Sequence, residues 1–91
     1  MLNIVSERFS LSVDLTKSNL TLAERDIIRL LLSGFSVTEI SRLKNRKVKT
    51  ISNQKQNAYK KLDIRNDVNL FSGLINQWGM EVKNNNINVT A

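Results

Sequence analysis

The chain has 91 residues, a formal net charge of +6, and neither cysteine nor histidine. That length suffices for one small domain, and the missing residue types exclude disulfides, zinc sites and Ser-His or Cys-His nucleophiles. The charge favours a nucleic-acid partner over a membrane, because no apolar run approaches the roughly 20 residues that a spanning helix needs.

The first residues lack the basic start and long apolar stretch of a signal peptide, so we expect a cytoplasmic protein associated with the nucleoid. The eight acidic residues are scattered along the chain, and the sequence has no glycine-rich phosphate loop. We therefore expect no enzyme activity, no cofactor and no metal site.

Residues 1–19 form the part of the chain that is hardest to interpret. Four apolar residues alternate with polar ones, a period of two that is typical of a short strand with one buried face. These residues are Phe9, Leu11, Val13 and Leu15. The segment is compatible with a linker remnant, an arm packed on the helices or a disordered stretch, and we treat it as an N-terminal arm or linker.

A first helix is predicted to begin after Thr21, which forms a capping box with Glu24, three residues further on. Gly34 ends this helix, because glycine readily takes the left-handed geometry of a helix end. The predicted apolar face consists of Ala23, Ile27, Leu30 and Leu31.

A second capping box, Ser36 with Glu39, opens a short helix that is predicted to run to about residue 43. Val37, Ile40 and Leu43 are expected to face inward. A basic turn at residues 44–47 then leads to a longer helix, and this order and spacing predict a helix-turn-helix.

The longer helix, residues 48–62, is expected to carry the function. Its predicted buried face comprises Val48, Ile51, Ala58, Tyr59 and Leu62, and the opposite face comprises Lys49, Asn53, Gln56 and Lys60. Such polar side chains can reach base edges and phosphates, although ordinary solvated helices carry them too. Residues 40–62 contain eight basic residues and no acidic one, and this uniform sign favours an anionic partner.

A fourth helix is predicted between a cap at Asn66 or Asp67 and an end at Gly79. Its apolar stripe consists of Val68, Phe71, Leu74, Ile75 and Trp78. Two alternatives remain open: the whole stripe packs on the first and third helices, or part of it forms a dimer interface, for which Leu74 and Trp78 are the candidates. Residues 81–91 are expected to be a frayed, disordered tail.

The ordered spacing of these residues resembles the LuxR/GerE-type helix-turn-helix of bacterial transcription regulators. The matching positions are Leu20-Thr21, Glu24, Ile27-Ile28, Leu30-Leu31, Gly34, Ser36, Glu39-Ile40, Lys49-Thr50-Ile51-Ser52 and Lys61-Leu62. Within that family, residues 45–55 look most like the output domains of the Rcs capsule-regulator and fimbrial-regulator subgroup.

The resemblance implies an all-α domain of four helices at residues 20–80, with the third helix in the major groove and dimerisation through the fourth. It places base contacts on Ser52, Asn53 and Gln56, with Lys49 on the same face. It places phosphate contacts on Thr50, Gln54, Lys55 and Lys60, and Lys47 lies at the helix start, where phosphate often binds.

The sequence departs from the family at several positions. Lys44 occupies a place that is usually apolar, so either the end of the second helix is shifted or Leu43 turns inward. Lys47 replaces a capping serine. Gln54 and Ser52 stand where many members carry histidine and lysine, so the preferred base sequence is expected to differ.

The leading interpretation is a regulator that binds double-stranded DNA as a homodimer or as a heterodimer with a related regulator. A second interpretation is a co-regulator that heterodimerises with another LuxR-type regulator and binds DNA weakly alone. A third is a sigma-factor promoter-reading region, which shares the start of the first helix and the helix-turn-helix.

Overall fold

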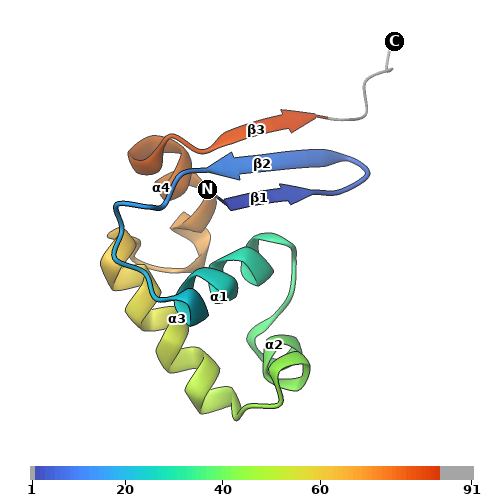
Figure 1. The fold of residues 1–91 in the computed structure, drawn as a ribbon, viewed down its shortest axis with the longest axis vertical. Coiled ribbons are helices and arrows are strands. Elements are labelled where there is room, and N and C mark those ends of the chain that lie inside the picture. The colour runs from blue at the N-terminus through green and yellow to red at the C-terminus, as the bar shows by residue number, and fades with distance from the viewer. Residues whose placement is uncertain (1, 85–91) are drawn as a thin grey trace.

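Residues 2–84 are described by a computed structural model, in which four α-helices accompany a three-stranded antiparallel sheet. The elements are β1 (Leu2–Val5), β2 (Phe9–Val13), α1 (Leu22–Leu32), α2 (Val37–Lys44), α3 (Val48–Leu62), the 3-10 turn η1 (Asp67–Asn69), α4 (Leu70–Trp78) and β3 (Glu81–Asn84). Figure 1 shows the sheet at one end of the molecule and the helix-turn-helix at the other. The helices lie where the sequence predicts them, but the expected all-α class is wrong.

The sheet has the order β1-β2-β3. Its central strand is therefore β2, which lies in the N-terminal segment of residues 1–19. Leu2 pairs with Val13 and Ile4 pairs with Leu11, which puts these four buried side chains on the face turned towards the helices. The predicted period of two is therefore confirmed in β2. Within this segment, the buried side chains of β1 and β2 pack on the helices.

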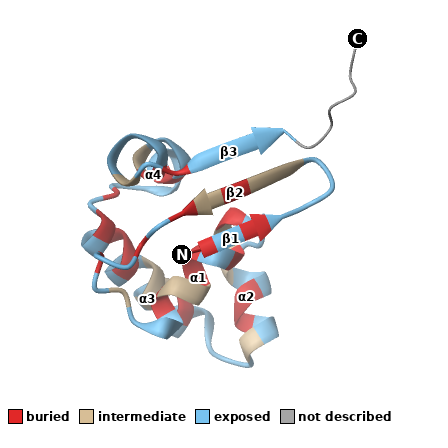
Figure 2. Cartoon of the chain, turned by 45° about the horizontal axis from the view of Figure 1, so that its top comes forward, coloured by how far each residue is buried: buried red, intermediate tan, exposed pale blue. Residues whose placement is uncertain are grey.

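The C-terminal strand β3 overturns the expectation of a frayed tail for residues 81–84. Val82 pairs with Leu11 and Asn84 pairs with Phe9, so β3 completes the sheet by lying along β2. All four β3 residues are exposed (Figure 2). A strand with no buried residue shows no alternation of apolar and polar residues. Because β3 is held by main-chain pairing, its sequence does not predict a strand. The rest of the expected tail, residues 85–91, lies outside the described residues.

Two hydrophobic cores meet along α1. The larger one joins the sheet to α4 and to the C-terminal half of α3, and α1 contributes Ile28 and Leu32 to it. The smaller one holds the helix-turn-helix together and consists of Ile27, Leu30, Ile40 and Ile51, with Leu31 and Val37 packed against it. Because α1 buries side chains on two sides, its apolar stripe is wider than one face requires.

Glu24 connects the start of α1 to the end of α3. Both predicted capping boxes are present, and in the first the Glu24 amide donates to the Thr21 hydroxyl while the Thr21 amide donates to the Glu24 carboxylate. The same carboxylate oxygen accepts a hydrogen bond of 2.7 Å from the Lys61 ammonium. Burial raises the pKa of Glu24, but the bonds from Lys61 and Thr21 outweigh it and the net pKa lies below its ordinary value.

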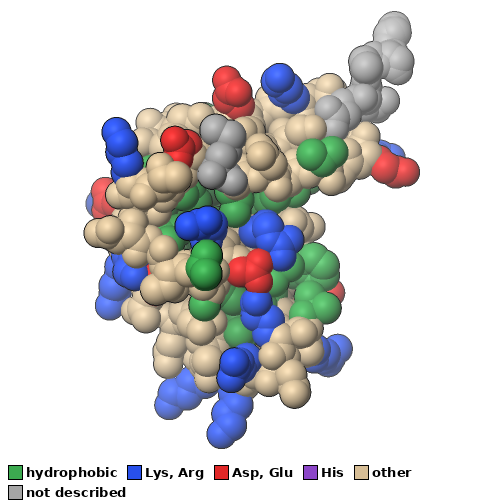
Figure 3. Space-filling model, in the orientation of Figure 1, with side chains coloured by type: hydrophobic (Ala, Val, Ile, Leu, Met, Phe, Trp, Pro, Cys, Tyr) green, Lys and Arg blue, Asp and Glu red, His purple; other side chains and the backbone are tan. Residues whose placement is uncertain are grey.

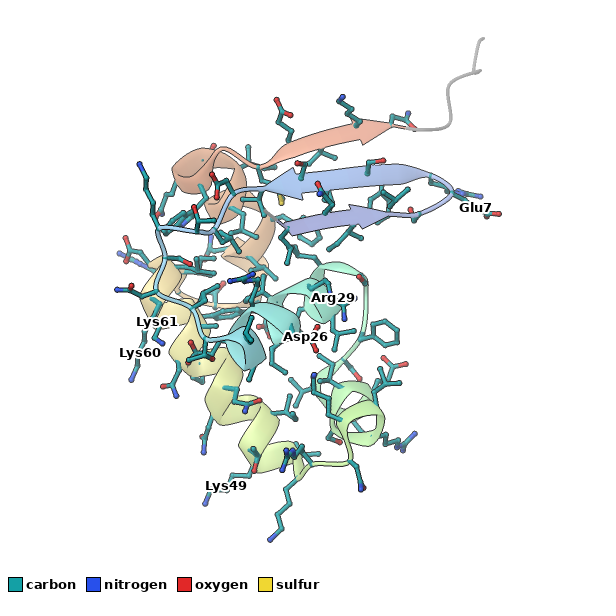
Figure 4. The ribbon with its side chains drawn as sticks, in the orientation of Figure 1. Glu7, Asp26, Arg29, Lys49, Lys60 and Lys61 are labelled. Atoms are coloured by element: carbon teal, nitrogen blue, oxygen red, sulfur yellow. The ribbon has the colours of Figure 1, made fainter. Side chains whose placement is uncertain are left out.

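The end of α2 differs from the inward-facing pattern expected from the sequence. Leu43 is 60% exposed, whereas the half-buried Lys44 turns inward and its ammonium binds Asp26 of α1. Asp26 also accepts a 2.6 Å hydrogen bond from Arg29. Figure 4 shows the side chains of both residues on the side of α1 that faces α2. An ion pair thus takes the place of the usual apolar contact. Val48, expected in the buried face of α3, is also exposed, because it is the first residue of the helix.

Replacing Glu24 with glutamine tests the link between α1 and α3. Glutamine still completes a capping box but loses the charge attraction to Lys61, so we expect the free energy of unfolding at neutral pH to fall by about 1 kcal/mol. Because the folded-state pKa of Glu24 lies below its ordinary value of 4.5, this stabilisation is present above about pH 4.5 and is lost as the pH falls through the folded-state pKa. Urea unfolding at several pH values measures it.

Glu39→Gln is the matched control. Glu39 holds the same place in the second capping box, but the structure of residues 2–84 records no ion pair for it. We expect this variant to lose less stability than Glu24→Gln. An equal loss in both variants, or a loss from Glu24→Gln that persists unchanged in acid, would contradict the role given to the pair with Lys61.

Candidate nucleic-acid interface

The outward face of α3 is the most distinctive surface of the molecule. Ile51, Ala58, Tyr59 and Leu62 are buried and fix the helix against both cores. On the opposite side, at intervals of four and three residues, stand four exposed side chains: Lys49, Asn53, Gln56 and Lys60. Figure 4 shows Lys49 and Lys60 pointing away from the body of the protein. Fifteen residues make α3 about 22 Å long, a rod that the major groove can accommodate.

The remaining base-contact candidate, Ser52, is half-buried at the side of this stripe. Of the phosphate-contact candidates, Lys47 and Thr50 are exposed at the start of α3, and Lys47 makes no side-chain cap, as its replacement of a capping serine predicts. The uncapped backbone N–H groups and the helix dipole give this end a partial positive charge, which favours an anion.

Gln54 and Arg46 lie in a shallow hollow that the sequence did not predict. Its lining consists of Ala23, Leu43, Lys44, Arg46, Thr50 and Gln54. Arg46 is exposed beside the start of α3, and it was not predicted from the sequence as a contact residue, although it belongs to the basic run. In Figure 3, blue Lys and Arg side chains gather over the α2–α3 turn and the adjoining part of α3. This end of the molecule is the cationic one.

Lys55, expected to contact phosphate, is held by another part of the chain. Its ammonium lies 3.1 Å from one carboxylate oxygen of Asp67 and 3.3 Å from the other, and its side chain is only 12% exposed. The Tyr59 hydroxyl donates to Asp67 at 2.8 Å. This bond and that from Lys55 lower the pKa of Asp67, and burial followed by the Asp67 contact raises the pKa of Tyr59. Asp67 therefore joins η1 to α3. It binds the ammonium of Lys55, the side chain that was expected from the sequence to contact a DNA phosphate.

The α4 candidates are placed differently from each other. Leu74 is fully buried in the larger core, so it offers no surface to a second chain in this structure. Trp78 is half-buried, and its indole N–H donates to the Leu62 carbonyl at 3.0 Å. The exposed apolar side chains of this region are instead Val68, Phe71 and Ile75.

Two other kinds of feature are absent from the described residues. Within residues 2–84, no three His, Cys, Asp or Glu side chains are grouped so that they could bind a metal ion. Nor does this part of the chain contain a helix with the length and apolarity needed to cross a membrane.

Comparison with known proteins supports a regulatory role for the same region. The family model GerE, described as bacterial regulatory proteins of the luxR family, matches residues 18–72, more than half of the chain. The chain belongs to the luxR family. The matched segment includes α1, α2 and all of α3, and it begins after β2 and ends before β3. The sheet therefore consists of residues outside the family match.

Two curated proteins of Escherichia coli K12 are similar to this luxR-family chain. The cyclic di-GMP phosphodiesterase PdeL is 42% identical over 59 residues, which are 65% of this chain and 16% of PdeL. The transcriptional regulatory protein RcsB is 47% identical over 51 residues, which are 56% of this chain and 24% of RcsB. The chain thus corresponds to about a quarter or less of the length of these relatives.

Solved structures of RcsB have the same helical arrangement. A complex of the two-component response regulator RcsB with DNA is 43% identical, with a TM-score of 0.60, over 64% of this chain and 29% of the solved one. A structure of the RcsB response regulator of Salmonella typhimurium is 45% identical, with a TM-score of 0.58, over 60% of this chain and 27% of that one.

The contact between Asp67 and Tyr59 gives a spectroscopic prediction, because Tyr59 is the only tyrosine in the chain. In the wild-type protein we expect ultraviolet absorbance titration to show ionisation well above the ordinary tyrosine pKa of 10.0. Replacing Asp67 with asparagine removes a negative charge beside the phenol, so the pKa of Tyr59 should fall towards 10.0 while burial keeps it above that value.

Asp63→Asn serves as the control for that titration. Asp63 is exposed and takes a left-handed conformation at the end of α3, which asparagine also tolerates. Since the structure records no hydrogen bond between the Asp63 and Tyr59 side chains, the Tyr59 titration should be almost unchanged. If both variants shifted it equally, the effect would reflect net charge and not the Asp67 contact.

Proposed function

We propose that this chain binds double-stranded DNA sequence-specifically through α3 and acts as the DNA-binding part of a transcription regulator. The observation that carries the proposal is the outward stripe of α3, in which exposed amides and cations stand on a helix whose other face is fixed in two cores. Amide side chains pair with base edges in the major groove, and cations neutralise phosphates.

We assign base contacts to Lys49, Ser52, Asn53 and Gln56. We assign phosphate contacts to Lys47, Thr50, Gln54 and Lys60, and to Lys55 only if DNA displaces it from Asp67. Support for these roles comes from exposure: Lys49, Asn53, Gln56 and Lys60 are open along α3, whereas Lys55 is held within the chain. The likeness to RcsB, one structure of which is a complex with DNA, supports DNA binding by this chain.

We further propose that the chain binds DNA as a dimer through α4. The exposed apolar side chains Val68, Phe71 and Ile75 support this proposal, with the partly exposed edge of Trp78 beside them. Leu74 contributes by fixing α4 to the core and not by direct contact. A second copy of the chain and a related luxR-family regulator are both compatible with such a surface.

We also propose that the chain has no catalytic activity. PdeL is a phosphodiesterase, but the similarity covers only 16% of it. The chain has no histidine or cysteine to act as a nucleophile or general base, and three of its carboxylates, Glu24, Asp26 and Asp67, are bonded to cations of the fold.

The direct test is binding of the purified chain to a pool of randomised duplexes at near-physiological salt, followed by sequencing of the bound fraction. We expect an enriched inverted repeat, because a two-fold dimer places two copies of α3 in successive major grooves. A single enriched half-site would retain DNA recognition but contradict the dimer. Binding without enrichment would overturn sequence-specific recognition.

Two substitutions separate base readout from phosphate attraction. Gln56→Ala is expected to relax the preference at one base pair by about 1–3 kcal/mol and to leave the others unchanged. Lys60→Ala should weaken binding to all duplexes alike and reduce the slope of log affinity against log salt by about one unit. Fluorescence anisotropy with matched and mismatched duplexes measures both.

Arg8→Ala is the control for the loss of one positive charge. Arg8 is exposed in the β1–β2 turn, where Figure 4 shows the adjacent Glu7 far from α3. We expect this variant to change the salt slope little. The roles would be wrong if Lys60→Ala altered which bases are preferred while Gln56→Ala did not.

A further inference from the structure

The outer edge of β3 presents main-chain groups to solvent. β3 lies at the end of the sheet order, and no strand among residues 2–84 pairs with its outer side (Figure 1). The N–H and C=O groups on such an edge are a template for pairing with another strand. The other edge strand, β1, is the one that packs beside α1, so β3 is the more accessible of the two.

The sequence of β3 is complementary to itself when two copies run antiparallel. If the two-fold axis passes through Val82, Glu81 of each copy lies opposite Lys83 of the other, and Val82 lies opposite Val82. Directly opposed residues of opposite charge stabilise an antiparallel pair. Both charged residues are exposed, and within residues 2–84 neither forms an ion pair.

Neighbouring registers are unfavourable. An axis through Glu81 would oppose two carboxylates, and an axis through Lys83 would oppose two ammonium groups. Registers that would oppose adjacent residues, such as Val82 and Lys83, are excluded by symmetry, because directly opposed side chains lie on one face of the sheet and adjacent residues point to opposite faces. Among the axes through Glu81, Val82 and Lys83, the pattern Glu-Val-Lys therefore favours the one through Val82.

The selected register also covers apolar surface. Val82 pairs with Leu11 within the sheet, so its side chain is on the same face as the buried residues Leu11 and Ile4. It is nevertheless 51% exposed, because nothing among residues 2–84 lies beyond it on that face of the sheet. A second Val82 would extend the apolar row across the axis, and an isologous contact of this kind closes at two copies.

We propose that β3 is a self-association surface, through which two copies of this chain join their sheets into one six-stranded antiparallel sheet centred on Val82. This contact uses residues outside the luxR-family match and is separate from the α4 surface. It does not require DNA, so it stands or falls independently of the proposed function.

Disulfide cross-linking of the full 91-residue chain tests the register. The chain has no cysteine, so Val82→Cys introduces a single thiol. Opposed residues in an antiparallel pair have Cα atoms about 4.5–5.5 Å apart, a separation that a disulfide spans. We expect mild oxidation without DNA to give a covalent dimer. Val5→Cys, at an exposed position of the other edge strand, is the matched control and should cross-link about fivefold more slowly.

Charge exchange in the Val82→Cys background provides the sharper test. Glu81→Lys and Lys83→Glu each place like charges opposite one another, so each should slow cross-linking about fivefold or more. The double variant Glu81→Lys/Lys83→Glu restores opposite charges and should recover the parent rate. A mixture of the two single variants should cross-link to each other in preference to themselves.

These variants also distinguish the contact from general charge repulsion. Lys83→Glu lowers the net positive charge, so general repulsion would make it cross-link faster, whereas the proposed pairing makes it slower. Circular dichroism checks that each variant is folded. Cross-linking of Val82→Cys no faster than that of Val5→Cys, or single charge variants as fast as their parent, would overturn the proposal.

The unmodified chain provides a measurement that needs no substitution. Hydrogen exchange of the β3 amides should slow as the protein concentration rises, because pairing removes them from solvent. Charged residues on an edge strand can also serve to keep other strands away. In that case β3 exchange would be independent of concentration, and this result too would overturn the proposal.

Discussion

The carboxylate of Glu24 is the contact that joins the two helices on which the candidate interface depends. It completes the cap of α1 and binds Lys61 at the end of α3, so one buried side chain fixes where α1 begins and where α3 lies against it. Below this contact, Ile27 and Leu30 of α1 hold Ile51 of α3 in the smaller core. Together with Ala58, Tyr59 and Leu62 in the larger core, these two attachments set the direction of the outward face of α3 and of the polar side chains on it.

The helical part of the fold could be predicted because its signals are local. Capping boxes, left-handed glycines at 34 and 79, and apolar residues repeating every three or four positions fix the helices within a residue or two. The sheet could not be predicted in full. The alternation in β2 is visible, but β1 has only four residues and β3 buries none, so their pairing depends on contacts between distant segments.

The candidate site shows the same division. The exposed stripe of α3 follows from helical periodicity alone, and the exposure of Lys49, Asn53, Gln56 and Lys60 agrees with it. Lys55 shows what periodicity cannot reveal, because its partner, Asp67, is twelve residues away in another element. Lys44 is a second example of a long-range partner that periodicity does not reveal. The apolar residue Leu43 was expected to face inward, but Lys44 does so instead, because its ammonium binds Asp26 on α1. Long-range ion pairs, unlike caps, have no fixed spacing in a sequence.

The pairing of β2 with β3 has a consequence for how the chain folds. It joins Phe9 to Asn84, so the ladder closes a loop that contains nearly all of the described residues. Closing so long a loop costs conformational entropy before any strand contact is gained, whereas α1, α2 and α3 meet through short connections. The helix-turn-helix can therefore form first, with the sheet added later. Once the sheet is closed, β1 and β2 contribute Leu2, Ile4, Leu11 and Val13 to the larger core, so we expect these two strands to unfold together with it.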